Sequence, residues 1–399
     1  MASMAMTSLS PPASAVEANR LGIAALQAGD PAAAATHFSA AAAADPQSGA
    51  LQRNLASAWR ALGDEARELA ALDAALAVDR RDLMAWVRKA ERHEARGELG
   101  AALGAWSAAT ALGGQLDPLP PPLAPLLAHG QAFIAGATDT MFASVTDALA
   151  PMRAELSEAE MRRGDAFVAS ALGRRRIYKN QCAGLHYPFL PADEFFDRGH
   201  FPWFAEVEAQ TDAIRSELVA LLDDPGDALR PYVRMDAGTP DSIWSPLDNR
   251  LDWGACFLWE YGEPNRAVLD RCPVTAAMLT AVPGAPIPGR SPSAFFSLLK
   301  PRTRIPAHTG VTNTRAIVHL PLIVPPGCGF RVGGETRAWE EGKAFAFDDT
   351  IEHEAWNDSD ELRAVLIFDV WNPHLAARER DLLTRYFAAA DATGFAIPR

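Results

Sequence analysis

The chain has 399 residues, 49% of them hydrophobic and 22% charged, and its formal net charge is −13. This length suits two domains, and the apolar content excludes a disordered chain. The acidic balance argues against a nucleic-acid-binding protein and against a partner of anionic membranes. No run approaches the ~20 apolar residues of a membrane helix, and the N-terminus lacks the pattern of a signal peptide. We therefore expect a cytoplasmic protein.

The cysteines give no sign of a disulfide framework or a zinc site. No two of them form a C-x-x-C pair, and there are four in all: Cys182, Cys256, Cys272 and Cys328. Free thiols in a reducing compartment are the expected state.

The first part of the chain repeats with a period of 34 residues. Gly29, Gly63 and Gly97 are 34 apart, and each is followed at one fixed distance by a large apolar residue. Glycine allows the left-handed turn that ends a helix. Amphipathic helices on both sides of such a glycine, at this period, resemble the tetratricopeptide repeat (TPR). The resemblance implies three stacked helical pairs over residues 15–113.

Three further segments are expected around these repeats. Residues 1–14, rich in Ala, Ser, Met and Pro, are expected to be disordered. Residues 114–177 begin with a Pro-rich stretch that predicts a stiff linker, followed by helical patterns at about 130–149 and 157–172. The sequence leaves open whether these helices form a last repeat or a cap between domains.

The amino-acid composition changes at about residue 178, where aromatic residues become frequent. A helix is predicted over 204–222 and another over 375–390. Between them, strand-like runs alternate with Gly, Pro and Asn turns, at 254–262, 294–301, 316–327, 329–339, 342–357 and 362–371. This spacing predicts a double-stranded β-helix of the jelly-roll or cupin-like type over 178–399. The predicted fold class is thus α+β multidomain, with all-α TPR-like repeats followed by this β domain.

Two histidines and an arginine in the β-rich part form a candidate metal site. His308 is expected near the start of the barrel strands, His353 after a short turn, and Arg363 inside an apolar strand. A buried arginine needs an anionic partner, and its fork suits a carboxylate. Two imidazoles plus such an arginine are what an Fe(II) enzyme that uses 2-oxoglutarate requires.

The third ligand of the usual facial triad is missing. The carboxylate expected two residues after His308 is replaced by Gly310, which leaves an open position for water or a halide. Asp349 is a candidate for the missing ligand. We favour for it the role of a hydrogen-bond acceptor from a ligating histidine.

Residues 305–373, which begin IPAHTGVTNTRAIVHL and end LRAVLIFDVWNP, resemble the core signature of aspartyl/asparaginyl β-hydroxylases. The segment YPFLPADEFFDRGHFPWFAEVEA resembles the stretch before that core, so the likeness covers about 180–385. In that family two histidines hold the metal and water takes the place of the carboxylate, which accounts for the glycine in HTG.

The resemblance implies a role for each matching residue. His308 and His353 would bind Fe(II). Ser297 and Arg363 would hold the distal carboxylate of 2-oxoglutarate, and His319 would contact its metal-proximal carboxylate.

Substrate contacts are implied for two more arginines. Arg315 would face the substrate carboxylate or the cosubstrate, and Arg331 is a secondary candidate. Family members often carry another arginine two residues before the position of His319, where this chain has Ile317. We therefore expect this chain to bind an acidic substrate differently from those family members.

The predicted activity is that of a 2-oxoglutarate-dependent dioxygenase of the peptide-aspartate β-hydroxylase type. It would hydroxylate the β-carbon of an aspartyl or asparaginyl residue. The repeats would recruit the peptide or protein substrate in a concave groove, or else support the catalytic domain or mediate oligomerisation. Three alternatives stay open: a hydroxylase of a small molecule or lipid, a non-haem iron halogenase, and a TPR scaffold with an inactive barrel.

Overall fold

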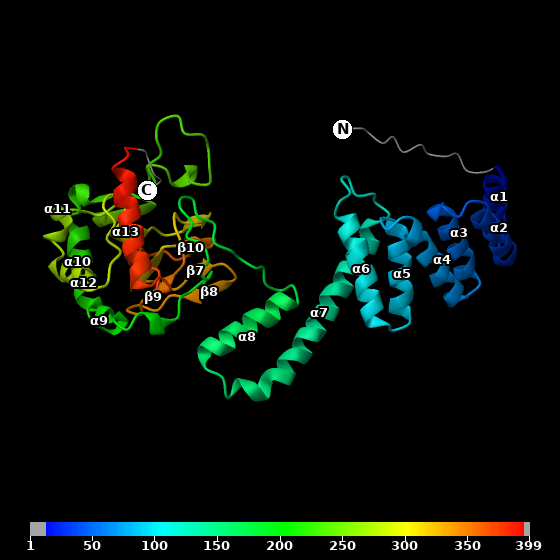
Figure 1. The fold of residues 1–399 in the computed structure, drawn as a ribbon, viewed down its shortest axis with the longest axis horizontal. Coiled ribbons are helices and arrows are strands. Elements are labelled where there is room, and N and C mark those ends of the chain that lie inside the picture. The colour runs from blue at the N-terminus through cyan, green and yellow to red at the C-terminus, as the bar shows by residue number, and fades with distance from the viewer. Residues whose placement is uncertain (1–12, 395–399) are drawn as a thin grey trace. The chain divides into compact units, whose positions relative to one another are not determined.

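The computed structural model describes residues 13–394 and shows two compact units, divided between Leu156 and Ser157 (Figure 1). This division falls inside the connecting region expected at 114–177. Residues 1–12 and 395–399 lie outside the described part, so most of the segment expected to be disordered is not described. Among the described helices, none is long and apolar enough to cross a membrane.

The first unit is a row of paired helices. Its seven helices are α1 (Ala13–Gln27), α2 (Pro31–Ala44), α3 (Gly49–Ala61), α4 (Glu65–Val78), α5 (Leu83–Ala95), α6 (Leu99–Gly113) and α7 (Ala124–Arg153). Helices α1 and α2, α3 and α4, and α5 and α6 pack as pairs, and each pair contacts the next. This arrangement confirms the prediction of TPR-like helical repeats.

The 34-residue glycines make the turns inside the pairs. Gly29, Gly63 and Gly97 have φ values of +78°, +74° and +68°. Glycine adopts this left-handed conformation without the steric cost that a Cβ would add. The 34-residue period therefore arises because each repeat has one such turn at the same position.

Large apolar side chains on the second helices form the core of this unit. Phe38, Leu72 and Trp106 are at most 1% exposed. Helix α7 packs on α6, and a Cβ at Gly130 of α7 would lie 2.5 Å from the ring of Trp106. Helix α7 thus extends the stack beyond the third pair, whereas α8 (Glu158–Ala171) belongs to the second unit.

The second unit contains two antiparallel sheets. One has the strand order β1-β2-β4-β11-β6-β9, with β3 paired to β2, and the other has the order β5-β10-β7-β8. The strands of the larger sheet are β1 (Leu229–Pro231), β2 (Trp253–Glu260), β3 (Glu263–Pro264), β4 (Ala294–Leu299), β6 (Arg315–Ile323), β9 (Phe345–Phe347) and β11 (Arg363–Trp371). Those of the smaller sheet are β5 (Thr303–His308), β7 (Cys328–Val332), β8 (Glu335–Ala338) and β10 (His353–Asn357).

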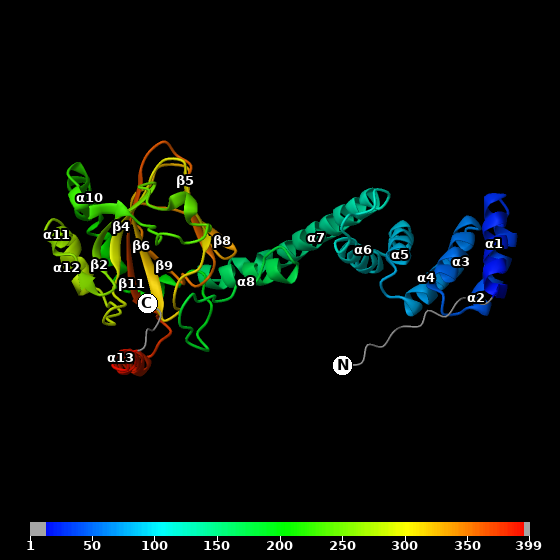
Figure 2. The same ribbon diagram turned by 90° about the horizontal axis from the view of Figure 1, so that it is seen from above.

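The larger sheet has a helix-covered face and a face toward the smaller sheet (Figure 2). Its side chains alternate, so that Phe296 of β4 and Val318 of β6 pack in one cluster with Leu218. That cluster joins the sheet to the helices α9 (Phe204–Glu208), α10 (Thr211–Asp223), α11 (Arg266–Leu269) and α12 (Pro273–Ala281). On the other face, Leu299 of β4 and Phe330 of β7 share a second cluster, which binds the two sheets together.

Several details differ from the elements predicted from the sequence. Every strand-like run contains a strand, but the strands β1, β3 and β5 and the helices α11 and α12 were not predicted. The helix expected over 204–222 is two helices, α9 and α10, and the Thr211 hydroxyl donates a hydrogen bond of 2.7 Å to the Glu208 carbonyl at the break. The last helix, α13 (Ala377–Asp391), lies close to the predicted 375–390.

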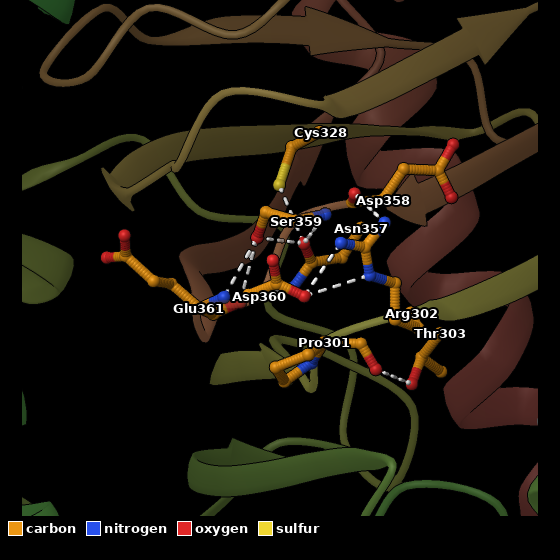
Figure 3. Close-up of polar contacts among 9 residues, drawn as sticks. All are labelled: Pro301, Arg302, Thr303, Cys328, Asn357, Asp358, Ser359, Asp360 and Glu361. Carbon is orange, nitrogen blue, oxygen red and sulfur yellow. Dashed lines mark hydrogen bonds and ion pairs between the residues drawn. The ribbon is translucent and has the colours of Figure 1, made fainter.

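A buried asparagine fixes the turn between β10 and β11 (Figure 3). The Asn357 amide donates to the carbonyls of Leu299 and Glu361 at 2.9 and 2.8 Å. Its oxygen accepts from the backbone and hydroxyl of Ser359 and from the thiol of Cys328. The turn therefore connects both sheets immediately before Arg363.

Candidate functional site

A cavity of about 380 Å³ lies between the two sheets. Six of the seven residues predicted for the site line it: Ser297, His308, Arg315, His319, His353 and Arg363. They come from β4, β5, β6, β10 and β11, so the fold gathers side chains that are up to 66 residues apart, as Ser297 and Arg363 are.

The two histidines expected to bind metal lie side by side. His308 of β5 and His353 of β10 are cross-strand partners, and their ring centroids are 4.1 Å apart. A β-bulge in β10 just after His353 shifts the register, and bulges commonly redirect side chains next to active sites. The pairing of two short strands therefore brings both imidazoles to one end of the cavity.

Each imidazole is held by one nitrogen, which leaves the other available. Nδ1 of His308 is 2.7 Å from the Pro306 carbonyl, and Nδ1 of His353 is 3.0 Å from the Ile351 carbonyl. A carbonyl only accepts, so Nδ1 carries the proton and Nε2 has a free lone pair. Burial lowers the pKa of His308, and burial together with His308 lowers the pKa of His353 to about 3. Both rings are thus neutral near pH 7, as metal ligands must be.

The other end of the cavity holds a buried cation and a hydroxyl. Arg363 is 1% exposed, and its Nη1 donates to the Ser297 hydroxyl at 3.2 Å. The indole of Trp253 donates to the same oxygen at 3.1 Å. The hydroxyl oxygen thus accepts two bonds, and its own hydrogen is left to donate to an anion.

Arg363 has the features of a carboxylate-binding residue. Burial lowers its pKa to about 10, so the guanidinium remains charged at neutral pH. Its Nε has no hydrogen-bond partner among residues 13–394, and neither does Nδ1 of the neighbouring His319. A buried charge without a counterion is costly, so the site is incomplete without an anionic ligand.

Asp349 occupies the space that Gly310 leaves open. A Cβ at Gly310 would lie 2.0 Å from the Asp349 carboxyl, and the Gly310 amide donates to the Asp349 backbone carbonyl at 2.6 Å. Burial raises the pKa of this carboxyl to about 7, against the opposing effect of Arg315. Its Oδ1 also has no hydrogen-bond partner within the described chain. The Nδ1 atoms of His308 and His353 bond to backbone carbonyls, so the prediction that Asp349 accepts a hydrogen bond from a ligating histidine is wrong.

Arg315 is already paired inside the protein. Its Nη1 lies 2.6 Å from Asp369, a residue of β11 that is 4% exposed, and also donates to the Arg290 carbonyl. The guanidinium lines the cavity, but a protein carboxylate neutralises its charge. This pair reduces its capacity to hold a substrate carboxylate.

Arg331 does not lie with the other predicted residues. It does not line the cavity, and its guanidinium binds Glu354 and, at 3.0 Å, Glu352. These glutamates flank His353 in the sequence. The prediction that Arg331 contacts substrate is therefore withdrawn, because cross-strand pairing directs its side chain to these two acids.

The sequence did not single out an aromatic wall on the substrate side of the cavity. Tyr232 stacks on Trp253 with ring centroids 3.9 Å apart, and Trp244 meets the His308 ring edge-on at 4.9 Å. Phe257 and Phe295 extend the wall and lie 4.9 Å apart. Tyr232 and Trp244 lie in irregular segments, where no periodicity marks them as inward-facing.

The candidate metal site offers two protein ligands, His308 and His353. Within the described residues, no three His, Cys, Asp or Glu side chains converge as a metal cluster. The donor set is two imidazole nitrogens, a set that suits iron, copper or zinc and leaves the remaining positions to non-protein ligands. The residues present fit a metal that is completed by a chelating acid.

Comparisons with known proteins find relatives of the second unit. Residues 208–373 match the model of the aspartyl/asparaginyl beta-hydroxylase family. The chain is 34% identical over 187 residues to the aspartyl/asparaginyl beta-hydroxylase of Mus musculus, covering 45% of this chain and 24% of that protein. It is 36% identical over 192 residues to the ornithine lipid ester-linked acyl 2-hydroxylase of Rhizobium tropici, covering 47% of this chain and 64% of that protein. Residues 208–373 are therefore similar to this family of hydroxylases, which confirms the resemblance drawn from the sequence.

The matched relatives are longer than the shared part. The chain spans about a quarter of the mouse protein's length. Solved TPR structures match the N-terminal part weakly: PcrH bound to the chaperone-binding region of PopD has a TM-score of 0.29 at 22% identity, and covers 34% of this chain and 99% of that chain. At this score the likeness adds nothing to the helical pairs seen directly.

Proposed function

We propose that the second unit is an Fe(II)- and 2-oxoglutarate-dependent dioxygenase that hydroxylates an unactivated C–H bond. The proposal rests on one cavity in which several buried polar groups have no hydrogen-bond partner among the described residues. His308 and His353 offer two nitrogen lone pairs at one end, and the uncompensated Arg363 lies at the other. A keto acid with a distal carboxylate is the ligand that would satisfy both ends.

The strand order supports a jelly roll around this cavity. The eight strands β4–β11 pair in nested fashion: β4 with β11, β5 with β10, β6 with β9, and β7 with β8. Such nesting folds one long hairpin into two facing sheets, which is the jelly-roll arrangement. We propose this fold for residues 294–371.

When bound, Fe(II) and 2-oxoglutarate would supply the oxidising chemistry with dioxygen, whose two oxygen atoms go to the alcohol and to succinate as CO₂ is released. The protein's own residues orient these groups. Arg363 and the Ser297 hydroxyl would hold the distal carboxylate, and His319 would contact the carboxylate next to the metal. The Asp349 carboxyl, which lies beside Gly310 with Oδ1 unpaired among the described residues, would accept a hydrogen bond from a ligand of the metal.

The rival functions fit the cavity less well. The space at Gly310 that a halide would need is filled by the Asp349 carboxyl, which disfavours a halogenase. An inactive scaffold would leave three buried polar groups, on His319, Asp349 and Arg363, without purpose and at a cost. Both points support hydroxylation.

The substrate is a separate question. An aspartyl or asparaginyl side chain was predicted from the sequence, and the printed names of the relatives include both that class and a lipid acyl chain. An aspartyl carboxylate needs a cation beyond the one that holds the cosubstrate. Arg315 is paired with Asp369, so we propose the reaction class without that substrate.

Succinate release tests the proposal. The wild-type protein with Fe(II), ascorbate and 2-oxoglutarate should form succinate, and His308→Ala should reduce the rate to the level without metal. His129→Ala, on an exposed histidine of α7 in the first unit, is the matched control and should leave the rate unchanged. Equal succinate formation by the His308 variant would show that the metal site is elsewhere.

A further inference from the structure

We propose that residues 236–246 form a lid over the His308 end of the cavity, and that lifting of Trp244 admits and releases the ligands of that site. The lid deepens the proposed function, because it names what controls access to the metal ligands, and in this respect it rests on that function. Support comes from the attachment of the loop, from the place of its tryptophan and from the open space on its outer side.

The loop is attached to the second unit at its two ends. The Asn249 amide donates to the Val233 carbonyl at 3.0 Å. The Met235 amide donates to the Asp248 carboxylate at 2.7 Å and so ties one end of the loop to the other. Asn249 has a φ of +53°, a left-handed conformation that asparagine tolerates better than most residues. A loop whose ends meet in this way is a compact Ω-loop, a class that frequently carries function.

Between its ends, the loop has no polar attachment to the rest of the unit. Within the described chain, every hydrogen bond that residues 236–246 make has its partner between Asp236 and Asp248. Residues 236–243 are exposed. Segments with few buried contacts open at a lower free energy than the core strands. The loop can therefore move while its two ends stay in place.

One aromatic side chain fastens the loop to the cavity. The ring of Trp244 meets the His308 ring edge-on with centroids 4.9 Å apart, and its centroid is 6.1 Å from that of Trp253. Phe257 and Phe295 of the same aromatic wall lie on paired strands, which fix their backbones. A single aromatic contact is weak enough to break and reform. Trp244 thus covers a proposed metal ligand from a segment that moves without disturbing the sheets.

The outer side of the loop borders open space. A depression of about 440 Å³ is lined by Ile243 and Pro246 of the loop and by Ile305 and Pro306 of β5. Ile305 and Trp244 also line the cavity, so the loop separates the cavity from this depression. The loop is therefore not packed between other elements and has room to swing. Loops that close over a site sequester it from water and open to release ligands.

Labelling of a buried thiol tests the lid without any metal. Ile305 is 5% exposed and packs in one cluster with Trp244, so the thiol of Ile305→Cys should react with iodoacetamide only when the loop lifts. Asp248→Ala removes the bond to Met235 and should speed this labelling about fivefold, the factor expected for one lost hydrogen bond. Mass spectrometry of the labelled peptide gives the rate.

Asp236→Ala is the matched control for the neck variant. It makes the same substitution in the same loop, and its carboxylate has no hydrogen bond or ion pair within the described chain. The labelling rate of Ile305→Cys should therefore stay unchanged in this background. Equal labelling rates with and without Asp248→Ala would overturn the inference.

Metal exchange provides a second measurement that does not need the cysteine variant. Entry of Mn(II) together with 2-oxoglutarate, and its loss to excess EDTA, are timed in the full chain. A gate changes both rates by one factor and leaves Kd unchanged, whereas a side chain that only supports His308 changes Kd. We expect Trp244→Ala to raise both rates about fivefold, because it removes one aromatic contact, and Trp244→Phe to keep the wild-type rates. Unchanged rates in Trp244→Ala, or a raised exit rate alone, would contradict the lid.

The two measurements separate the lid from the proposed function. Thiol labelling requires no metal, so a labelling rate that responds to Asp248→Ala supports the lid even in a protein that binds no Mn(II). Absence of Mn(II) binding by the wild type would refute the proposed metal centre alone. Failure of the labelling test beside normal Mn(II) binding would refute the lid and leave the metal centre intact.

Discussion

The buried guanidinium of Arg363 lowers the stability of the folded protein and is available to bind an anion. Its guanidinium is buried, charged and bonded to one hydroxyl, and no carboxylate forms an ion pair with it within the described residues. Its aliphatic stem could be kept while the charge is removed, because methionine has a similar length. Apolar replacements of buried ionic groups are often neutral or stabilising.

We therefore predict that Arg363→Met has an equal or higher melting temperature than the wild type. The same variant should bind 2-oxoglutarate at least about tenfold more weakly, which corresponds to about 1.4 kcal/mol. Thermal unfolding and calorimetric titration measure the two effects on one preparation. Retained 2-oxoglutarate affinity would show that Arg363 does not receive the cosubstrate.

The residue identities of the site were largely predictable, but their pairings were not. Arg363 could be found because a charged side chain in an apolar strand is costly unless it has a ligand. His308 and His353 could be found from their arrangement with it and from the family resemblance. The ion pairs of Arg315 and Arg331 could not, because they join residues on neighbouring strands whose register is absent from the sequence. Local composition predicts which side chains are unusual, and tertiary pairing decides which of them remain available.

At the scale of elements, the turn between β10 and β11 positions the site. Asn357 is fully buried and its amide joins this turn to β4 and, through Cys328, to β7 (Figure 3). Removing it leaves the buried carbonyl of Leu299 without this donor, while the part-buried carbonyl of Glu361 keeps a bond from Ser359. Each such loss costs about 1–3 kcal/mol.

We predict that Asn357→Ala lowers the free energy of unfolding of the second unit by about 2–4 kcal/mol. Urea unfolding followed by tryptophan fluorescence provides the measurement. Ser170→Ala on α8 serves as a control outside the turn. A loss below about 0.5 kcal/mol would mean that water replaces the asparagine and that the turn is not fixed by it.

The loops that carry Gly310 and Asp349 are in close contact. The added methyl of Gly310→Ala would need the Asp349 carboxyl to move, and overpacking of this kind costs about 1–3 kcal/mol. We predict a lower melting temperature for Gly310→Ala and partial recovery in the double variant Gly310→Ala/Asp349→Ala. A melting temperature equal to the wild type in the single variant would show that the two loops are not in close contact.

The elements themselves could be predicted where their pattern was periodic. Strands such as β4, β6 and β11 are continuous apolar runs buried on both faces, and the sequence identified them. Strand β5, with the sequence TRIPAH, was missed because it contains a proline and charged residues. Its pairing with β10 arises from tertiary context, which overrides local strand preference.

At the scale of the whole molecule, the two units have separate cores. Buried clusters of the first unit contain helical residues such as Leu72 and Trp106, and those of the second contain strand residues such as Phe296 and Phe330. The 34-residue period predicted the first unit, and the alternation of strands and turns predicted the second. The helical pattern predicted at about 130–149 lies in α7, but its role as a last repeat or a cap was left open, because its packing on Trp106 is a tertiary contact.

We predict that Gly130→Val destabilises only the first unit. The substitution places a side chain against the Trp106 ring and should lower that unit's stability by about 1–3 kcal/mol. Circular dichroism at a helical wavelength should show this transition shifted, while succinate formation is unchanged. A joint shift of both properties would mean that the units unfold together.

The central claim is that His308 and His353 bind one metal that, with Arg363, completes a 2-oxoglutarate site. Its most direct test is calorimetric titration of 2-oxoglutarate into the anaerobic protein with and without Fe(II). The account predicts tight binding only with Fe(II), and loss of the metal-dependent part in His353→Ala. Equal binding with and without Fe(II), or an unchanged affinity in His353→Ala, would contradict it.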